Sequence, residues 1–268
     1  MIWAVGDIHG CYFTLKDLIS RIKEKDSSPT FIFVGDYADR GQNSKQAVDL
    51  VIDLVNQGHV AIRGNHDDII DFILNGSCKG DLSYFMHGTL CQENAIRYWN
   101  QHGFIETQKS YGIKDEEIIN ASFKEIESKL NKLVPKNHKD FFHNLPLFWE
   151  NEKYFVVHGF LNTSIEISRF GLSNHIRNKE EYTSALWDRP ITEIGFIENL
   201  KPKWGKFGVF GHTPVFVLGK TESIVTDYLC LIDTGACLAK KRTESCLSAI
   251  CLDTKEIVKS MTNPKDVY

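Results

Sequence analysis

Side chains that bind metals or move protons are grouped with glycine in five short segments of this chain. Imidazole nitrogen, carboxylate oxygen and amide oxygen together form a ligand set that manganese, iron or zinc accepts. One such side chain beside a glycine is most simply a turn, but five segments in succession indicate a metal site. In chain order, the segments are Gly6-Asp7-Ile8-His9-Gly10, Gly35-Asp36-Tyr37-Ala38-Asp39-Arg40-Gly41, Arg63-Gly64-Asn65-His66-Asp67, His158-Gly159 and Gly211-His212-Thr213-Pro214.

The spacing of these side chains suits two metal ions. Asp7 and His9 lie two positions apart, so both can face one ion from an extended turn. A central carboxylate such as Asp36 can bridge that ion to a second one. Two ions about 3.5–4 Å apart form a clamp for in-line displacement at phosphorus. The remaining candidate ligands, which would complete the second site, are Asn65, His158 and His212.

Short apolar runs lead into these segments and must hold them in place. Residues 2–5, 31–34 and 60–62 are rich in β-branched or aromatic side chains, which predicts buried strands. Apolar residues at helical spacing lie between them, at 15–22 and 48–55. Alternating strands and helices predict βαβ units and a largely parallel sheet. Ligands bind at the carboxyl ends of the strands in such sheets, which is where the candidate side chains fall.

The rest of the chain has a different pattern. Residues 76–111 are rich in glycine, aromatic and polar side chains, and residues 116–134 predict one amphipathic helix that ends at Pro135. Few helical patterns separate the later apolar runs, so the second half is expected to contain more strands. Two packed sheets flanked by helices would fit both halves. The later runs are 154–157, 208–210, 228–232 and 246–252.

Composition limits the possible partners and settings. With 268 residues the chain can form one large α/β domain. Its net charge of −4 and its lack of a dense basic tract argue against nucleic acid as a partner. The 7 cysteines are scattered without metal-site spacing, which favours reduced thiols in a cytoplasm. Without a signal peptide or a membrane-length apolar run, we expect a soluble cytoplasmic protein. Its oligomeric state cannot be inferred.

The five segments, in this order, resemble those of the metallophosphoesterase superfamily, and within it the phosphoprotein phosphatase branch with its bacterial and phage serine/threonine phosphatases. The resemblance extends from residue 2 to about residue 253. Three further segments agree with it: Leu145-Pro146-Leu147, Leu186-Trp187-Asp188-Arg189 and Ile232-Asp233-Thr234-Gly235. The resemblance implies an α/β fold, the αββα sandwich of two mixed sheets flanked by helices, in a single calcineurin-like domain over residues 1–268.

The resemblance also implies a dinuclear centre and its chemistry. A hydroxide that bridges the two divalent ions would attack phosphorus, with manganese as the favoured metal and iron or zinc as alternatives. The implied substrates are phosphomonoesters, foremost phosphoserine and phosphothreonine in proteins. The first ion would be held by Asp7, His9 and Asp36, and the second by Asp36, Asn65, His158 and His212.

The remaining roles follow from the same resemblance. Arg40, Arg63 and Arg189 would bind the phosphoryl oxygens, a task suited to planar guanidinium groups. His66 would protonate the leaving oxygen. Asp39 would orient the His66 ring and keep it cationic.

Two other enzyme classes compete with this interpretation. Diadenosine tetraphosphate hydrolases share the metal site, but Asp39 and Thr213 favour a protein phosphatase. A cysteine phosphatase would use the C-x5-R spacing of Cys91 and Arg97, yet the residues between them lack glycine and are typical of a helix interior. A scaffold without activity is disfavoured because no ligand position is lost.

Some residues keep open roles. The substrate cleft walls are expected within residues 76–150, where His102 is a candidate. The basic cluster Lys240-Lys241-Arg242 is most simply a solvated loop, or else a contact for an acidic substrate. The histidines outside the five segments are expected to be structural or on the surface: His59, His87, His102, His138, His143 and His175.

Overall fold

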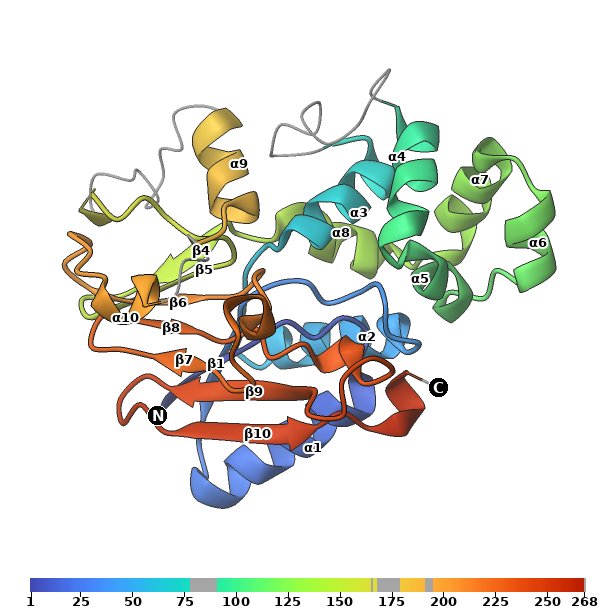
Figure 1. The fold of residues 1–268 in the computed structure, drawn as a ribbon. Helices are drawn as coiled ribbons and strands as arrows, with labels where there is room; N and C mark the ends of the chain where they lie inside the picture. The colour runs from blue at the N-terminus through green and yellow to red at the C-terminus, as the bar shows by residue number, and fades with distance from the viewer. Residues whose placement is uncertain (78–90, 165, 168–178, 191–194, 268) are drawn as a thin grey trace.

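Two five-stranded sheets stack face to face in the computed structural model, which describes residues 1–77, 91–164, 166–167, 179–190 and 195–267. Helices cover the outer face of each sheet (Figure 1). The first sheet contains β1 (Ile2–Val5), β2 (Thr30–Phe33), β3 (Val60–Ala61), β9 (Cys246–Cys251) and β10 (Ile257–Met261). The second contains β4 (Phe148–Glu150), β5 (Tyr154–Val157), β6 (Phe207–Phe210), β7 (Ile224–Val225) and β8 (Leu229–Leu231).

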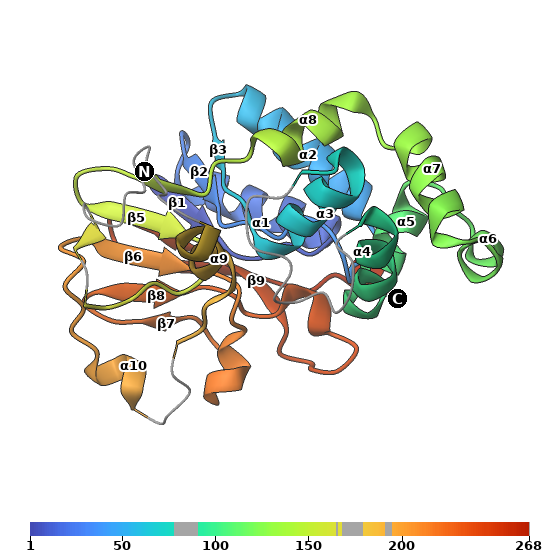
Figure 2. The ribbon, with the colours of Figure 1, turned by 90° about the horizontal axis from the view of Figure 1, so that it is seen from above.

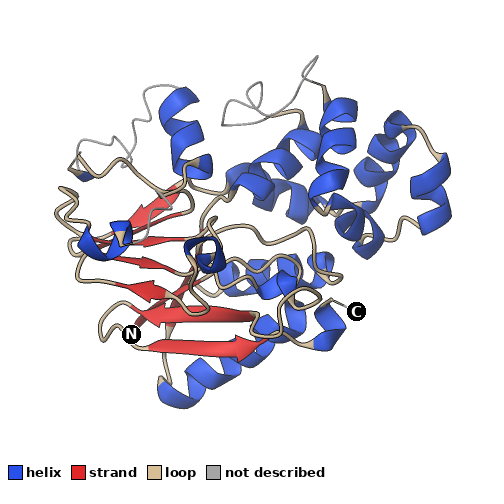
Figure 3. Cartoon of the chain, viewed as in Figure 1, coloured by secondary structure: helices blue, strands red, loops and turns tan. Residues whose placement is uncertain are grey.

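Each sheet contains three neighbouring parallel strands, with antiparallel pairing at one edge of the first sheet and at both edges of the second. The first sheet has the order β10-β9-β1-β2-β3, with β1, β2 and β3 parallel and β9 antiparallel to β1. The second has the order β4-β5-β6-β8-β7, with β5, β6 and β8 parallel. Both sheets are therefore mixed, as predicted, and their parallel strands bring several carboxyl ends to one edge of the sandwich (Figure 3).

Side chains on the two faces of each strand enter different cores. On β1, Ala4 packs between the two sheets, whereas Trp3 and Val5 pack against helices. On β2, Ile32 faces the other sheet and Phe33 faces the helices. Because both faces are buried, these strands are continuously apolar. The four layers confirm the predicted αββα sandwich.

The helices are mostly short. Among the described residues, no helix combines the length and the low polarity that crossing a bilayer would require. The α-helices are α1 (Tyr12–Lys25), α2 (Ser44–Asn56), α3 (Asn65–Asn75), α4 (Gln92–Trp99), α5 (Phe104–Ser110), α6 (Asp115–Asn120), α7 (Phe123–Leu133), α8 (Lys136–Asn144), α9 (Lys179–Trp187) and α10 (Phe196–Asn199). The 3₁₀ turns are η2 (Asn100–His102), η4 (Val215–Leu218), η5 (Ala236–Leu238) and η6 (Pro264–Asp266).

The single helix predicted over residues 116–134 is wrong. Two helices, α6 and α7, occupy this segment, and Ala121 and Ser122 between them are extended. The Ser122 hydroxyl accepts a hydrogen bond from the Glu125 N–H, and the Glu125 carboxylate accepts one from the Ser122 N–H. This Ser-x-x-Glu capping box starts a new helix. Ile119, assigned to the apolar face of the predicted helix, is 79% exposed.

Helices α3 to α8 form a group beside the sandwich, next to the carboxyl ends of the parallel strands (Figure 2). Within this group, α4, η2 and α5 occupy a stretch for which the sequence predicted helical character only between Cys91 and Arg97. Cys91 directly precedes α4 and Arg97 lies within it, as a helix-interior interpretation of this spacing requires.

The end of the chain is tied to the start of α1 through Asp266, which is fully buried. Its carboxylate accepts hydrogen bonds from the backbone N–H groups of Phe13 and Thr14, at 3.0 and 2.8 Å, and from the Thr14 hydroxyl at 2.7 Å. Asn43, at the start of α2, donates to the same carboxylate at 3.0 Å. Asp266 therefore caps α1 from a distant part of the chain, and its negative charge suits the helix N-terminus.

Replacing this cap should destabilise the fold. We predict that Asp266→Ala lowers the free energy of unfolding by about 3 kcal/mol, because several donors would lose a charged acceptor. Urea denaturation monitored by tryptophan fluorescence measures the change. Asp227→Ala, at an exposed aspartate, is the matched control and should change stability by no more than about 0.5 kcal/mol. Equal midpoints for the two variants would contradict the capping role.

Candidate metal and phosphate site

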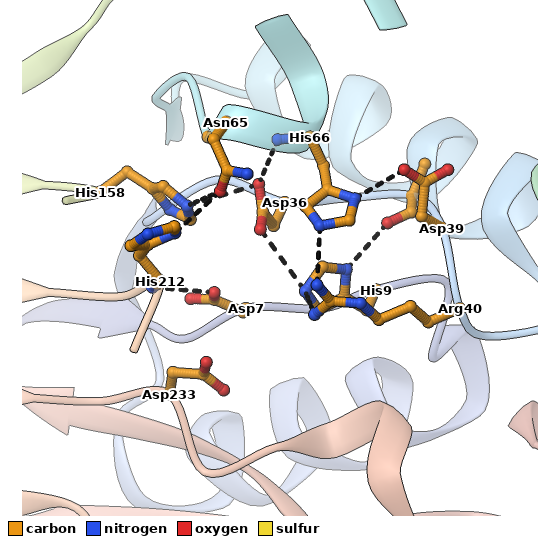
Figure 4. A network of polar contacts seen from close by, with 12 residues as sticks. Asp7, His9, Asp36, Asp39, Arg40, Asn65, His66, His158, His212 and Asp233 are labelled. Atoms are coloured by element: carbon orange, nitrogen blue, oxygen red, sulfur yellow. Dashed lines mark hydrogen bonds and ion pairs between the residues drawn. The ribbon is translucent and has the colours of Figure 1, made fainter. Parts of the chain in front are cut away.

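The predicted ligand side chains meet at the carboxyl ends of strands from both sheets (Figure 4). Asp7 and His9 follow β1, and Asp36 follows β2. His158 follows β5 and His212 follows β6, so the second sheet supplies two imidazoles that face the side chains from the first sheet. Asn65 and His66 begin α3, directly after β3. The parallel central strands thus deliver every predicted ligand to one place.

Asp36 lies at the centre of this group. Its Oδ2 is 3.4 Å from His9 Nε2, and its Oδ1 is 3.4 Å from His158 Nε2. Among the described residues, two groups of three side chains could each hold an ion, because the ligand atoms within each group all lie within 4.8 Å of one another. The groups are His9, Asp36 and His66, and Asp7, Asp36 and His158. Only Asp36 belongs to both groups, which is the position expected of a bridging carboxylate.

Hydrogen bonds behind the imidazoles aim their lone pairs at this centre. The Nδ1–H groups of His9 and His158 donate to the carbonyls of Ala38 and Val34, at 3.0 and 2.9 Å. When the rings are neutral, each therefore directs an unprotonated Nε2 at Asp36, in the tautomer that metal ligation requires.

The same arrangement recurs around Asn65. His212 donates from Nε2 to the Trp187 carbonyl at 3.0 Å, so its Nδ1 lone pair faces Asn65 Oδ1 at 2.9 Å. His158 Nε2 faces the same oxygen at 2.9 Å. Three electron-rich atoms converge here with no proton between them when the rings are neutral, which a cation would stabilise.

Burial strengthens the case for cations. Asp7 and Asp36 are each 2% exposed, and Asp7 Oδ1 has no hydrogen-bond partner within the part of the chain that the structure describes. Burial, with the nearby Asp233 carboxylate, raises the pKa of Asp7 well above its usual range. Burial opposes ionisation of Asp36 too, but His158 and His66 hold its pKa well below the usual range. Burial lowers the pKa of His158, yet Asp36 outweighs it and raises that pKa to about 9.

These residues fit a dinuclear metal site. An unpartnered buried carboxylate oxygen, a shared central carboxylate and convergent imidazole lone pairs are the features that divalent ions would satisfy. The donors are Asp7, His9, Asp36, Asn65, His158 and His212.

The loop that carries Asp36 is held by Asp67. The Asp67 carboxylate accepts the backbone N–H groups of Asp36, Tyr37 and Gly64, at 2.8, 3.2 and 2.8 Å. Gly64 is required because a Cβ at this position would collide with Asp36 Oδ1. In the described chain, six residues other than glycine have positive φ, and five of them are predicted site residues: His9, Asp36, Asp39, Arg40 and His212. Strain of this kind gathers at functional sites.

A buried hydrogen-bonded pair lies beside the ligands. His66 Nδ1–H donates to Asp39 Oδ2 at 2.6 Å, and both side chains are buried. The Arg40 guanidinium lies in front of the two neighbouring rings, with Nη2 at 2.8 Å from His66 Nε2 and Nη1 at 2.6 Å from His9 Nε2. His66 and Arg40, to which the resemblance assigns the roles of acid and phosphate-binding group, therefore lie together beside the ligands.

Arg189 approaches from the other side. Its Nη1 donates to the His212 carbonyl at 3.1 Å and contacts the Thr213 hydroxyl at 3.4 Å. Arg189 is exposed, so its remaining N–H groups face solvent beside the ligands His212 and Asn65.

The structure corrects the predicted role of Arg63. This side chain is fully buried, with Nη1 at 2.9 Å from Asp68 and 3.1 Å from Asp71. Its other nitrogens donate to backbone carbonyls, so the guanidinium has no free edge for a phosphoryl group. Arg63 instead links the start of α3 to the end of α8. The carbonyls are those of Phe142, His143 and Leu145.

Sequence reasoning gave no site role to three residues that lie at the site. Asp233 was named only as part of the segment Ile232-Asp233-Thr234-Gly235; it follows β8 and is buried near Asp7. Trp99 and Thr107 both donate to Asp39, at 2.7 and 2.6 Å. They come from α4 and α5, where no motif marked them.

The other singled-out residues lie where expected or outside the described residues. His59, His138 and His143 make structural contacts with Phe31, Asp49 and Asp71. His102 packs on Trp99, which packs on His66. Arg242 of the basic cluster stacks on Phe216. His87 and His175 lie outside the described residues.

Comparisons with known proteins agree with this geometry. The profile of the calcineurin-like phosphoesterase family matches residues 1–223. An asymmetrical bis(5'-nucleosyl)-tetraphosphatase from Oceanobacillus iheyensis is 22% identical over 257 residues, which cover 89% of this chain and 85% of the relative.

Two solved structures share the fold. A putative diadenosine tetraphosphatase superposes with a TM-score of 0.58 at 18% identity, covering 98% of this chain and 94% of the other. A protein serine/threonine phosphatase from Saccharomyces cerevisiae superposes with a TM-score of 0.53 at 16% identity, covering 100% of this chain and 83% of the other.

The shared carboxylate gives a metal-binding prediction. Asp36→Asn should weaken both ion sites together, by more than the roughly 10–100-fold that loss of an outer-shell partner costs. Equilibrium dialysis against manganese, followed by elemental analysis, measures the bound ions. Asp53→Asn, at an exposed aspartate of α2, should bind metal like the parent. Retention of both ions by Asp36→Asn would show that Asp36 does not bridge.

The buried position of Arg63 gives a stability prediction. Arg63→Gln should lower the free energy of unfolding by about 3–5 kcal/mol, because it removes the cation from a buried ion pair. Arg189→Gln serves as the matched arginine and should cost no more than about 0.5 kcal/mol, since its side chain is exposed. Urea denaturation compares them. An Arg63→Gln variant as stable as the parent would return Arg63 to the candidates for phosphate binding.

Proposed function

The chain belongs to the calcineurin-like phosphoesterase family, and on that premise we propose that it removes phosphate from phosphoserine and phosphothreonine in proteins. The observation that carries this choice is the pair formed by His66 and Asp39, joined at 2.6 Å beside Arg40. A serine or threonine alkoxide is a poor leaving group and needs a proton donor, which typically contributes about 10²–10⁴-fold. A nucleotide leaves as a stabilised phosphate anion and needs such a donor much less.

The reaction assigns a task to each side chain. Arg40 and Arg189 bind the phosphoryl oxygens, so Arg40 exchanges its contacts with His9 and His66 for contacts with substrate. This exchange frees His66 Nε2 to donate a proton to the leaving oxygen, while Asp39 holds Nδ1–H.

The ligand residues would hold two divalent ions, which would supply an activated water and positive charge at the phosphoryl group. We propose manganese as the resident metal, with iron or zinc as alternatives. Imidazole nitrogen, carboxylate oxygen and amide oxygen can bind all three metals.

A second candidate is the hydrolysis of dinucleoside tetraphosphates. The Oceanobacillus iheyensis relative with that name aligns over 89% of this chain. In addition, the partly exposed rings of Tyr98 and His102 lie 4.9 Å apart, and His102 packs on Trp99 beside His66. Aromatic rings of this kind can stack on a nucleobase.

A substrate panel distinguishes the two functions. With saturating manganese, we expect kcat/KM for a phosphoserine or phosphothreonine peptide to exceed that for diadenosine tetraphosphate by at least about tenfold, because a positioned acid accelerates expulsion of an alkoxide, whereas the dinucleotide gains little from it. The Asp36→Asn protein, purified in parallel, controls for contaminating phosphatases. Faster turnover of the dinucleotide would favour the second candidate, and no turnover of either would refute both.

A further inference from the structure

The Asp39 carboxylate is held from a part of the chain that contains none of the five motif segments. Besides His66, it accepts hydrogen bonds from Trp99 at the end of α4 and from Thr107 in α5. We propose that Trp99 and Thr107 are positioning residues for the phosphoesterase reaction, which fix Asp39 and through it the His66 ring. This inference rests on the proposed function, in which His66 donates a proton.

Trp99 holds the oxygen that His66 uses. Its indole Nε1–H donates to Asp39 Oδ2 at 2.7 Å, and the same oxygen accepts His66 Nδ1–H at 2.6 Å. The Trp99 ring is 1% exposed and meets the His66 ring edge-on, at 4.6 Å between centroids. Trp99 therefore restricts the position of the Asp39 carboxylate and of the His66 imidazole that this carboxylate orients.

Thr107 holds the other oxygen and the backbone. Its hydroxyl donates to Asp39 Oδ1 at 2.6 Å and accepts the Asp39 N–H at 2.9 Å. Asp39 has a φ of 72°, a left-handed conformation that residues other than glycine rarely adopt. The contact with Thr107 therefore helps to keep a strained residue in place.

The same segment also supports Arg40. The Gly103 carbonyl accepts the Arg40 N–H at 3.0 Å, and a Cβ at Gly103 would lie 2.6 Å from Arg40 Cγ. The region from α4 to α5 therefore contacts both the acid pair and a phosphate-binding arginine. A tryptophan that only filled the core would need some acceptor for its N–H, but not the carboxylate that orients the acid.

The test uses variants that remove hydrogen bonds of Asp39. Trp99→Phe loses the indole N–H together with some buried volume, and Thr107→Val loses the hydroxyl, with both of its hydrogen bonds to Asp39, at nearly constant shape. Thr107→Ser restores a hydroxyl and is the matched control. The kcat/KM values for a phosphoserine peptide and for p-nitrophenyl phosphate are measured with saturating manganese. The aryl ester is included because its p-nitrophenolate leaving group departs with little need of an acid. His66→Asn is measured in parallel.

We expect Trp99→Phe and Thr107→Val to lower kcat/KM for the peptide by about tenfold, the lower end of the range for outer-shell residues, and for the aryl ester much less. Thr107→Ser should recover most of the loss, and His66→Asn should show the same selectivity more strongly. NMR of the metal-free protein supplies a readout besides activity. The His66 Nδ1–H proton should lie far downfield in the parent and exchange faster with water in both variants.

The outcomes separate the two proposals. If His66→Asn is selective but Trp99→Phe and Thr107→Val lose both activities alike, or neither, the positioning role is overturned while the acid role stands. If His66→Asn harms both substrates equally, the acid role fails, and the positioning inference fails with it. An unchanged His66 Nδ1–H signal in the variants would also contradict the inference.

Discussion

The burial of several anionic and electron-rich atoms around Asp36 is the constraint on which the rest of the structure depends. Asp36 and Asp7 are almost inaccessible to water, and two imidazole nitrogens point at Asp36 rather than away from it. Such a group is unfavourable by itself, because buried charge and unpaired polar atoms lose hydration. The two sheets maintain it by bringing rigid strand ends together from both sides. The protein thus holds a geometry that only added positive charge completes.

The backbone around this group bears a related cost. Residues such as Asp36, Asp39 and Arg40 adopt left-handed conformations, each unfavourable by about 1–3 kcal/mol. The backbone N–H groups of Asp36 and Asp39 donate hydrogen bonds to Asp67 and Thr107, which hold these conformations. Gly64, which has no side chain, leaves room for Asp36. This explains why glycine and small polar residues recur beside the ligands: they allow the chain to turn where the ligands require it.

The sequence was sufficient to predict the layers and the convergence of the candidate ligands because both depend on local patterns. An apolar strand followed by glycine and a ligand is visible without knowing the fold. It was not sufficient for Arg63, because the ion pair with Asp68 and Asp71 exists only once α3 has formed beside α8. Trp99 and Thr107 were missed for a similar reason: their acceptor lies more than fifty positions away, so no local spacing reports the contact.

The tie between Asp266 and the start of α1 has a consequence for biosynthesis. β1 pairs with β2 on one side and with β9 on the other, and η6 then caps the helix that follows β1. The segment with Asp7 and His9 therefore leaves the ribosome long before the strand that completes its sheet. Contacts this distant in sequence slow folding. Until translation nears residue 266, the first ligands belong to an unfinished sheet, and a nascent chain must remain soluble without the frame that later holds its metals.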